Sequence, residues 1–262
     1  LETEIYKFYV GTSYRHLTVW DNGSVVKLTP PHDVLGKTIG EYLPEEVALK
    51  EMMKKSYDIL NHHPLNEERA KKGLNKANSL WFWGAGTKPS LSSFEEKTGL
   101  KGAVISAVDL LKGIAVGADM KVCQVEGATG SIDTNWEGKA QAAIDALLKG
   151  GNDFCYVHVE APDEMAHQGL TMEKVESIEY LDSRIIAPVK AALDAAGESY
   201  RFLILPDHPN LLRLRTHTAD PVPYILYDST KVQKKIARYG ETEAAATGIF
   251  EPKGHKLMER FL

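Results

Sequence analysis

Three short clusters of acidic and histidine residues stand out in the C-terminal part of this 262-residue chain. The cluster D-E-M-A-H holds Asp163 and His167, P-D-H holds Asp207 and His208, and T-H-T holds His217. Carboxylate and imidazole groups without thiolates suit Mn²⁺ or Zn²⁺ and disfavour soft metals. Two hard divalent ions need about six to eight ligands, delivered from several chain segments. The five residues therefore predict a two-metal centre of the kind that transfers phosphoryl groups.

The spacing and the sequence context of each cluster give separate support for this interpretation. Asp163 and His167 are four residues apart, so they face one ion if the segment coils into a helical turn. An acid such as Asp207 directly after a buried strand is costly without a partner. Pro221 and Pro223 favour an extended chain after His217. Each cluster alone also fits a commoner interpretation: a surface acid and histidine, a helix-capping aspartate, or a hydrogen-bonded histidine.

The elements that must position these residues alternate between strand and helix patterns. Strands are predicted at 102–108, 121–125, 154–159 and 200–205, and the longer helices at 135–149 and 174–196. Such repeated units indicate an α/β fold with a mostly parallel sheet flanked by helices. Reactive groups collect at the carboxyl ends of the strands in these sheets, where Asp163 and Asp207 fall.

The first part of the chain has a different character. Paired strands are predicted within residues 5–28, and a helical pattern follows from Pro44 to about Gly73 with a break at His63-Pro64. We therefore expect a smaller, inserted α+β domain over residues 1–78 and a metal-binding, phosphatase-like core over residues 79–262.

Composition narrows the classes of function. The net charge of −5 and the lack of a basic stripe argue against a nucleic-acid partner. No apolar run approaches the ~18 residues of a membrane span, so no membrane partner is expected. Two cysteines in apolar runs, Cys123 and Cys155, indicate reduced structural thiols and a cytoplasmic protein. The oligomeric state is left open.

Seven stretches of the chain resemble the alkaline-phosphatase superfamily, most closely the cofactor-independent phosphoglycerate mutases of archaeal type. They are S-Y-R-H-L at 13–17, L-T-P-P-H-D at 28–33, W-F-W-G-A-G at 81–86, G-A-V-I-S-A-V-D-L-L-K-G-I-A at 102–115, E-G-A-T-G at 126–130, V-E-A-P-D-E-M-A-H at 159–167 and G-H-K-L-M-E-R-F-L at 254–262. The resemblance implies interconversion of 3-phosphoglycerate and 2-phosphoglycerate, a small-molecule substrate, through a phosphoserine.

The resemblance also implies which residues hold the ions. Asp163, His167 and His217 would hold one ion, and Asp207 and His208 the other. The ions would be Mn²⁺ or Zn²⁺, with Mg²⁺ as a further option, and 2,3-bisphosphoglycerate would not be needed. We expect acidic residues to orient these ligands or, more commonly, to serve as turn and cap residues: Asp133, Glu160 and Asp220.

Other matches imply contacts to the substrate. Lys112, in D-L-L-K-G, matches a lysine that the family places near the phosphoryl group, and a solvent-facing helix lysine is its alternative. Lys112 and Arg15 are the expected catalytic residues of this chain. The expected substrate-binding residues are Arg15, His16, His32, Asp33, Lys88 and Lys112.

The chain also departs from the family's pattern. The family's metal-binding aspartate and nucleophilic serine are expected before residue 1, so the chain is predicted to be an inactive fragment of the mutase. Thr87 stands where many relatives have a basic residue, although Lys88 is adjacent. Three alternatives stay open: a phosphatase or other phosphomutase of the superfamily, a non-catalytic metal-binding relative, and a plain α/β interaction domain.

Overall fold

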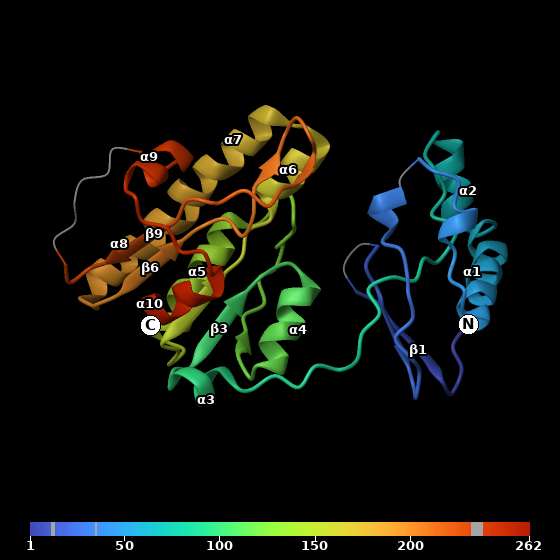
Figure 1. Ribbon diagram of the computed structural model, residues 1–262, viewed down its shortest axis with the longest axis horizontal. Coiled ribbons are helices and arrows are strands. Elements are labelled where there is room, and N and C mark those ends of the chain that lie inside the picture. The colour runs from blue at the N-terminus through green and yellow to red at the C-terminus, as the bar shows by residue number, and fades with distance from the viewer. Residues whose placement is uncertain (12–13, 35, 232–237) are drawn as a thin grey trace. The chain divides into compact units, whose positions relative to one another are not determined.

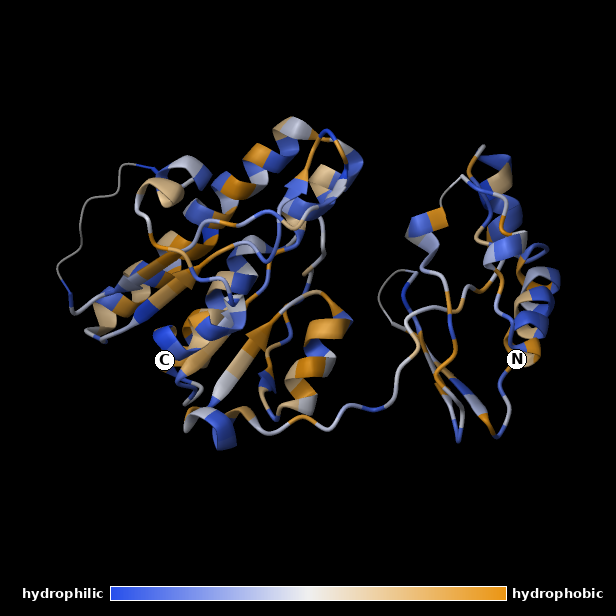
Figure 2. Cartoon of the chain, in the orientation of Figure 1, coloured by the Kyte–Doolittle hydropathy of each residue, from blue (hydrophilic) through white to orange (hydrophobic). Residues whose placement is uncertain are grey.

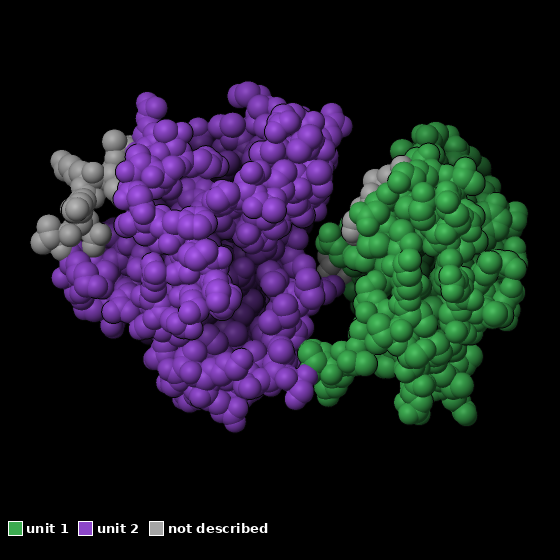
Figure 3. Space-filling model, in the orientation of Figure 1, with its two compact units in different colours: residues 1–89 green, residues 90–262 purple. Residues whose placement is uncertain are grey.

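A computed structural model describes residues 1–11, 14–34, 36–231 and 238–262 of the chain (Figure 1). The described residues form two compact units, residues 1–89 and residues 90–262, which Figure 3 shows in green and purple. Each unit has its own secondary structure.

The first unit pairs a small antiparallel ribbon with helices. Strands β1 (Tyr6–Tyr9) and β2 (Leu17–Trp20) pair so that Tyr6 lies opposite Trp20, and their rings stack with centroids 5.4 Å apart. The predicted strand pattern is wrong beyond Trp20, because the chain turns at Asn22, which has a φ of 52°. The 3₁₀ turns η1 (Pro31–Val34) and η2 (Gly40–Tyr42) follow.

Two helices complete the first unit. Helix α1 (Val47–Leu60) is followed by α2 (Pro64–Lys71). The predicted break between them is confirmed: the His63 side chain accepts a hydrogen bond from the Leu65 amide, and Pro64 occupies the first turn of α2, where its missing N–H costs nothing.

Residues 79–89 belong to the first compact unit, which ends at Pro89, and the domain boundary expected after residue 78 stays a prediction. The Leu80 amide donates to the Ser56 hydroxyl at 2.9 Å, and the Trp81 indole donates to the Thr29 carbonyl at 2.7 Å. These hydrogen bonds tie the segment to α1 and to the loop before η1. The expected substrate-covering role of this unit stays a prediction.

The second unit is built on a parallel sheet. Its strands β3 (Gly102–Ile105), β4 (Lys121–Val122) and β5 (Phe154–Val157) lie in the order β4-β3-β5, all parallel. Strands β6 (Arg201–Ile204) and β9 (Ile225–Asp228) form a separate antiparallel pair. Helix α3 (Phe94–Thr98) precedes β3, α4 (Asp109–Gly117) connects β3 to β4, and α5 (Trp136–Leu148) connects β4 to β5. The predicted α/β class is confirmed.

A long helical run follows β5. Helix α6 (Ala161–Gln168) leads to α7 (Thr171–Tyr180), the π-helical segment η3 (Leu181–Ile186) and α8 (Ala187–Ala196). The predicted helix over 174–196 is therefore confirmed, although a π-helical segment interrupts it. The unit ends with α9 (Glu241–Ala246), η4 (Gly254–Lys256) and α10 (Leu257–Phe261).

The core of this unit lies between its strands and the helices α5 and α8. Trp136 in α5 is buried among Ile105, Ile185 and Val189, and residues of β5 and β6 pack against the same cluster. Figure 2 shows apolar residues along β6 and β9. None of the helices within the described ranges is long and apolar enough to cross a membrane.

Candidate metal centre

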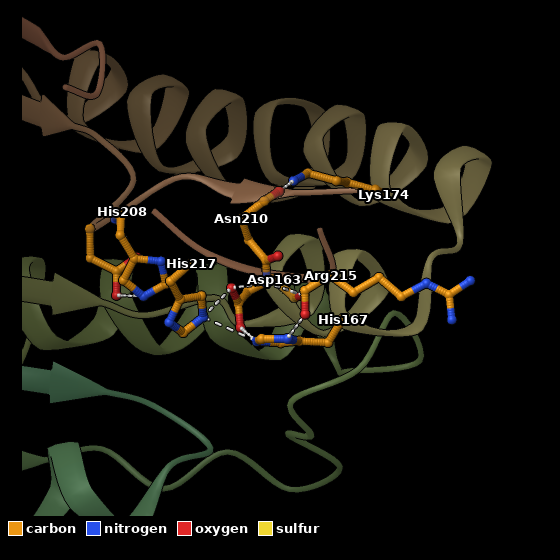
Figure 4. Close-up of polar contacts among 8 residues, drawn as sticks. Asp163, His167, Lys174, His208, Asn210, Arg215 and His217 are labelled. Atoms are coloured by element: carbon orange, nitrogen blue, oxygen red, sulfur yellow. Dashed lines mark hydrogen bonds and ion pairs between the residues drawn. The ribbon is translucent and has the colours of Figure 1, made fainter. Parts of the chain in front are cut away.

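Asp163, His167 and His217 converge in the second unit (Figure 4). One ligand atom from each lies within 4.8 Å of the others. The His167 Nε2 atom is 3.1 Å from Asp163 Oδ2 and 3.0 Å from His217 Nε2, and His217 Nε2 is 3.1 Å from Asp163 Oδ1. Ligand atoms about 3 Å apart fit adjacent positions around one ion with bonds of ~2.1 Å.

Helix α6 positions two of these residues. Pro162 lies in its first turn, and Gly169 ends it in the left-handed region with a φ of 75°, a conformation that favours glycine. The short helix therefore begins just after β5 and places Asp163 and His167 one turn apart on the same face. The helical turn expected from their spacing is present.

A two-residue strand pair positions the third. Strands β7 (Asn210–Leu211) and β8 (Thr216–His217) are antiparallel, with Asn210 directly opposite His217. The turn between them brings the chain back at Arg215, which adopts a φ of 54°. This turn delivers His217 to α6 from about fifty positions farther along the chain.

A backbone carbonyl fixes the proton on His167. The Nδ1 atom lies 2.9 Å from the Arg215 carbonyl oxygen, which can only accept, so Nδ1 carries the hydrogen and donates it. The Nε2 atom then lies beside Asp163 and His217, and in a neutral ring it would carry the lone pair that binds a metal ion. Metal-binding histidines commonly donate their second N–H in this way.

Asn210 contacts the same carboxylate oxygen of Asp163, Oδ1, that lies near His217. Its Nδ2 group donates to Asp163 Oδ1 at 2.7 Å and to the Asp163 carbonyl at 3.2 Å. Lys174 of α7 donates to the Asn210 carbonyl at 2.7 Å, and burial lowers the pKa of Lys174. The buried Oδ1 atom of Asn210 has no hydrogen-bond partner among the described residues, which ordinarily costs about 1–3 kcal/mol.

Asp207 and His208 lie directly beside this group. The ring of His208 is 3.7 Å from that of His217 between centroids, and its Nε2 atom is 3.3 Å from Asp207 Oδ2. Asp207 is largely exposed, and its Oδ1 atom accepts from the His208 amide at 3.1 Å. The structure thus brings all five predicted ligands to one edge of the second unit, and their role in metal binding stays a prediction.

A second polar cluster lies at the carboxyl ends of β3 and β5. Ser106 accepts from the Val108 amide at 3.0 Å and lies 3.2 Å from His158 Nδ1. Burial lowers the pKa of His158, and nearby Asp207 opposes that shift. Beneath it, buried Lys139 donates to the His158 carbonyl at 3.3 Å, and burial lowers the pKa of this lysine as well.

The remaining predicted residues are placed as follows. Lys112 lies in α4 with its Nζ 3.5 Å from Asp109 Oδ1, and it is partly buried. Asp133 and Asp220 accept hydrogen bonds from Thr129 and Thr218, both at 2.7 Å. Glu160 immediately precedes α6. Contact with the phosphoryl group and orientation of the ligands stay predictions for these residues.

The substrate-binding residues predicted in the first unit are Arg15, His16, His32, Asp33 and Lys88. The guanidinium of Arg15 lies 5.0 Å from the Tyr14 ring centroid, and His16 Nδ1 accepts from the Gly11 amide at 3.2 Å. His32 and Asp33 belong to η1, and the His32 side chain lies outside the described residues. Their contacts with substrate stay predictions.

Three contributors to the site carry no recognisable sequence signal: Asn210, Lys174 and the carbonyl of Arg215. Asn210 follows Asp207 in P-D-H-P-N and reads as an ordinary turn residue. A backbone carbonyl has no signal by nature, because every residue has one.

The site and the fold belong to a known class. The model of the metalloenzyme superfamily matches residues 15–259, and the chain belongs to that family. Members of this class use divalent metal ions. The fold is the alkaline-phosphatase-like fold.

Comparison with individual proteins gives a more specific similarity than the superfamily match. The chain is 47% identical to the probable 2,3-bisphosphoglycerate-independent phosphoglycerate mutase of Geobacter sulfurreducens, over 99% of this chain and 66% of that protein. It is 46% identical to the 2,3-bisphosphoglycerate-independent phosphoglycerate mutase of Methanosarcina barkeri, over 95% and 63%. The chain thus spans just under two thirds of the length of these curated relatives.

Two solved structures are similar. The PH0037 protein of Pyrococcus horikoshii matches 76% of this chain and 51% of its own, with a TM-score of 0.64 and 32% identity. The cofactor-independent phosphoglycerate mutase of Thermoplasma acidophilum matches 100% of this chain and 66% of its own, with a TM-score of 0.52. At 21% identity, the second likeness concerns the fold alone.

Proposed function

We propose that the protein is an isomerase that interconverts 3-phosphoglycerate and 2-phosphoglycerate without 2,3-bisphosphoglycerate. The convergence of Asp163, His167 and His217 within 4.8 Å supports this most directly, because a mutase of this class needs divalent ions at the phosphoryl group. The similarity to mutases that are 46–47% identical supports the choice of phosphoglycerate as substrate.

We assign one ion, Mn²⁺ or Zn²⁺, to Asp163, His167 and His217, and a second to Asp207 and His208 with further ligands. A mixed carboxylate and imidazole set suits these ions. When bound, the ions would neutralise charge on the transferred group. The donor set fits such an ion, because the Nδ1–H of His167 is held by the Arg215 carbonyl and its Nε2 is free to coordinate.

The side chains would divide the remaining work. The ammonium of Lys112 would pair with a phosphoryl oxygen, and its location at the start of α4, just after β3, is a usual one for such a contact. The other expected substrate contacts would come from Arg15, His16, His32, Asp33 and Lys88. The first unit would exclude water from the reaction, which favours transfer over hydrolysis.

We also propose that the protein works in the cytoplasm. Cys123 and Cys155 are both free thiols, which suits a reducing compartment.

The experiment is an assay of the full-length protein with 3-phosphoglycerate and Mn²⁺, without 2,3-bisphosphoglycerate. We expect 2-phosphoglycerate to form, Asp163→Asn to abolish turnover and Lys112→Ala to lower kcat by about 10²-fold or more. The control is Lys149→Ala, because Lys149 makes a comparable helical ion pair, with Asp145 at 2.7 Å, on α5.

Release of inorganic phosphate in place of 2-phosphoglycerate would show a phosphatase instead. Absence of both products from metal-loaded protein would favour a non-catalytic relative.

A further inference from the structure

The Asn210 amide group is almost completely buried and directs both N–H bonds at a single residue. Its exposed fraction is 6%. Nδ2 donates to the side chain of Asp163 at 2.7 Å and to the Asp163 carbonyl at 3.2 Å. Figure 4 shows Asn210 between Asp163 and Lys174.

The orientation of this amide is fixed by chemistry. Reversing it would place Asn210 Oδ1 against two oxygens of Asp163 that can only accept, so the NH₂ group must face Asp163. The opposite end, Oδ1, is buried without a partner among the described residues. An amide that serves stability alone would satisfy both ends. The asymmetry indicates that this one serves the carboxylate.

The backbone of Asn210 is held just as firmly. It pairs with His217 in the β7–β8 ribbon, and its carbonyl accepts from Lys174 of α7. Asn210 therefore touches one predicted ligand through its side chain and lies opposite another through its strand. Asp163 and His217 come from distant parts of the chain, and Asn210 links both.

We propose that Asn210 is a positioning residue for the metal centre: it orients the Asp163 carboxylate so that Oδ2 faces the Nε2 atom of His167 while Oδ1 faces the Nε2 atom of His217. This inference rests on the metal centre proposed above. With Nδ2 bound to Oδ1, the carboxylate is held in one rotational state, and the three ligand atoms are preorganised before an ion arrives.

The test measures Mn²⁺ affinity of the full-length protein by isothermal titration calorimetry, together with the visible absorption of Co²⁺ at the site. Asn210→Leu keeps the number and branching of the side-chain heavy atoms but has no donor and is larger, and Asn210→Ala removes the donor and leaves a cavity. We expect both variants to bind Mn²⁺ about 10–100-fold more weakly and to change the Co²⁺ spectrum. Thermal melting should separate them, with the alanine variant less stable.

Two controls make the result decisive. Asn66 in the first unit is equally buried, at 5% exposed, and bonds only to backbone groups of Leu60 and Ala77, so Asn66→Leu should lower stability without changing Mn²⁺ affinity. Asp163→Asn removes a proposed ligand and gives the Mn²⁺ affinity expected when the metal site is lost.

The possible outcomes separate the two proposals. If Asp163→Asn loses the ion but Asn210→Leu binds as wild type does, Asn210 acts by packing at most and the inference is overturned. If Asp163→Asn binds Mn²⁺ as wild type does, the proposed metal centre itself is wrong.

Discussion

The imidazole rings of His208 and His217 lie 3.7 Å apart between centroids, with 35° between their planes. They belong to the two different ion sites proposed for this chain. His217 presents Nε2 to Asp163, whereas the Nδ1 atom of His208 is buried without a partner among the described residues. The two proposed sites are therefore in direct side-chain contact, and a substitution at one is expected to alter metal binding at the other.

The first prediction concerns these two rings. His217→Ala removes a ligand of the first site and should weaken Mn²⁺ binding there by at least about 100-fold, whereas His208→Ala removes only packing and should weaken it by about 10-fold. Calorimetric titration with Mn²⁺ measures both. His63→Ala, which removes the helix cap of α2, is the control and should leave the affinity unchanged. Equal losses for His208 and His217 would contradict the assignment of ligands.

The second prediction concerns the end of helix α6. Gly169 and Gly197 end α6 and α8 with φ values of 75° and 72°, so alanine at either should cost about 1–2 kcal/mol. A Cβ at Gly169 would lie 2.7 Å from the Arg215 guanidinium, whereas Gly197 has nothing within 4 Å.

Because Arg215 is exposed, its guanidinium can move aside while its carbonyl stays on His167. We therefore expect Gly169→Ala and Gly197→Ala to lower the free energy of unfolding by similar amounts, with Mn²⁺ affinity unchanged in both. Chemical denaturation and metal titration measure the two quantities. A selective loss of metal binding in Gly169→Ala would mean that the Arg215 side chain, and not only its carbonyl, orders the site.

The third prediction concerns a thiol. Burial, with a smaller contribution from Cys123, raises the pKa of Cys155 to about 12. At pH 8 we expect iodoacetamide to leave Cys155 unmodified in a Cys123→Ser variant and to modify it fully after unfolding, as mass spectrometry would show. Since the folded pKa is raised, the associated stability is complete below about pH 9 and is lost as the pH rises from 9 towards 12. Rapid labelling of the folded protein at pH 8 would contradict this.

The fourth prediction concerns Lys139, which is 1% exposed and is the fourth residue of α5. Desolvation lowers the pKa of Lys139, the charge of Glu160 opposes that shift, and Nζ donates to the His158 carbonyl at 3.3 Å. Lys139→Met keeps the packed methylenes without the ammonium, so we expect the free energy of unfolding at pH 7 to stay equal or to rise by about 1 kcal/mol. Lys139→Ala leaves a cavity and should lower it by about 2 kcal/mol or more. A methionine variant as unstable as the alanine variant would show that the charge itself is needed.

The sequence predicted the residues that converge at the proposed metal centre, but not the residues that hold them in place. The four-residue spacing of Asp163 and His167, and the placement of Asp207 after a strand, follow from periodicities that a single sequence displays. The role of Asn210 depends on the β7–β8 turn, which pairs residues seven apart and has no hydrophobic pattern. The strand pattern predicted up to residue 28 was too long, because the observed strand ends at Trp20 and no strand follows the turn at Asn22 among residues 21–30.

The π-helical segment Leu181–Ile186 has a consequence for how the second unit is assembled. Each residue of an α-helix advances the side chains by about 100° around the axis, and a wider turn resets that phase. Before the reset, α7 packs on α6, which carries Asp163 and His167; after it, α8 packs on α5 in the apolar core. The continuous helix therefore presents one face to α6 and, after the segment, a different face to α5. Deleting a single residue within 181–186 would rotate these two faces relative to each other, so that the helix could no longer pack on the core and on the metal-bearing helix at once.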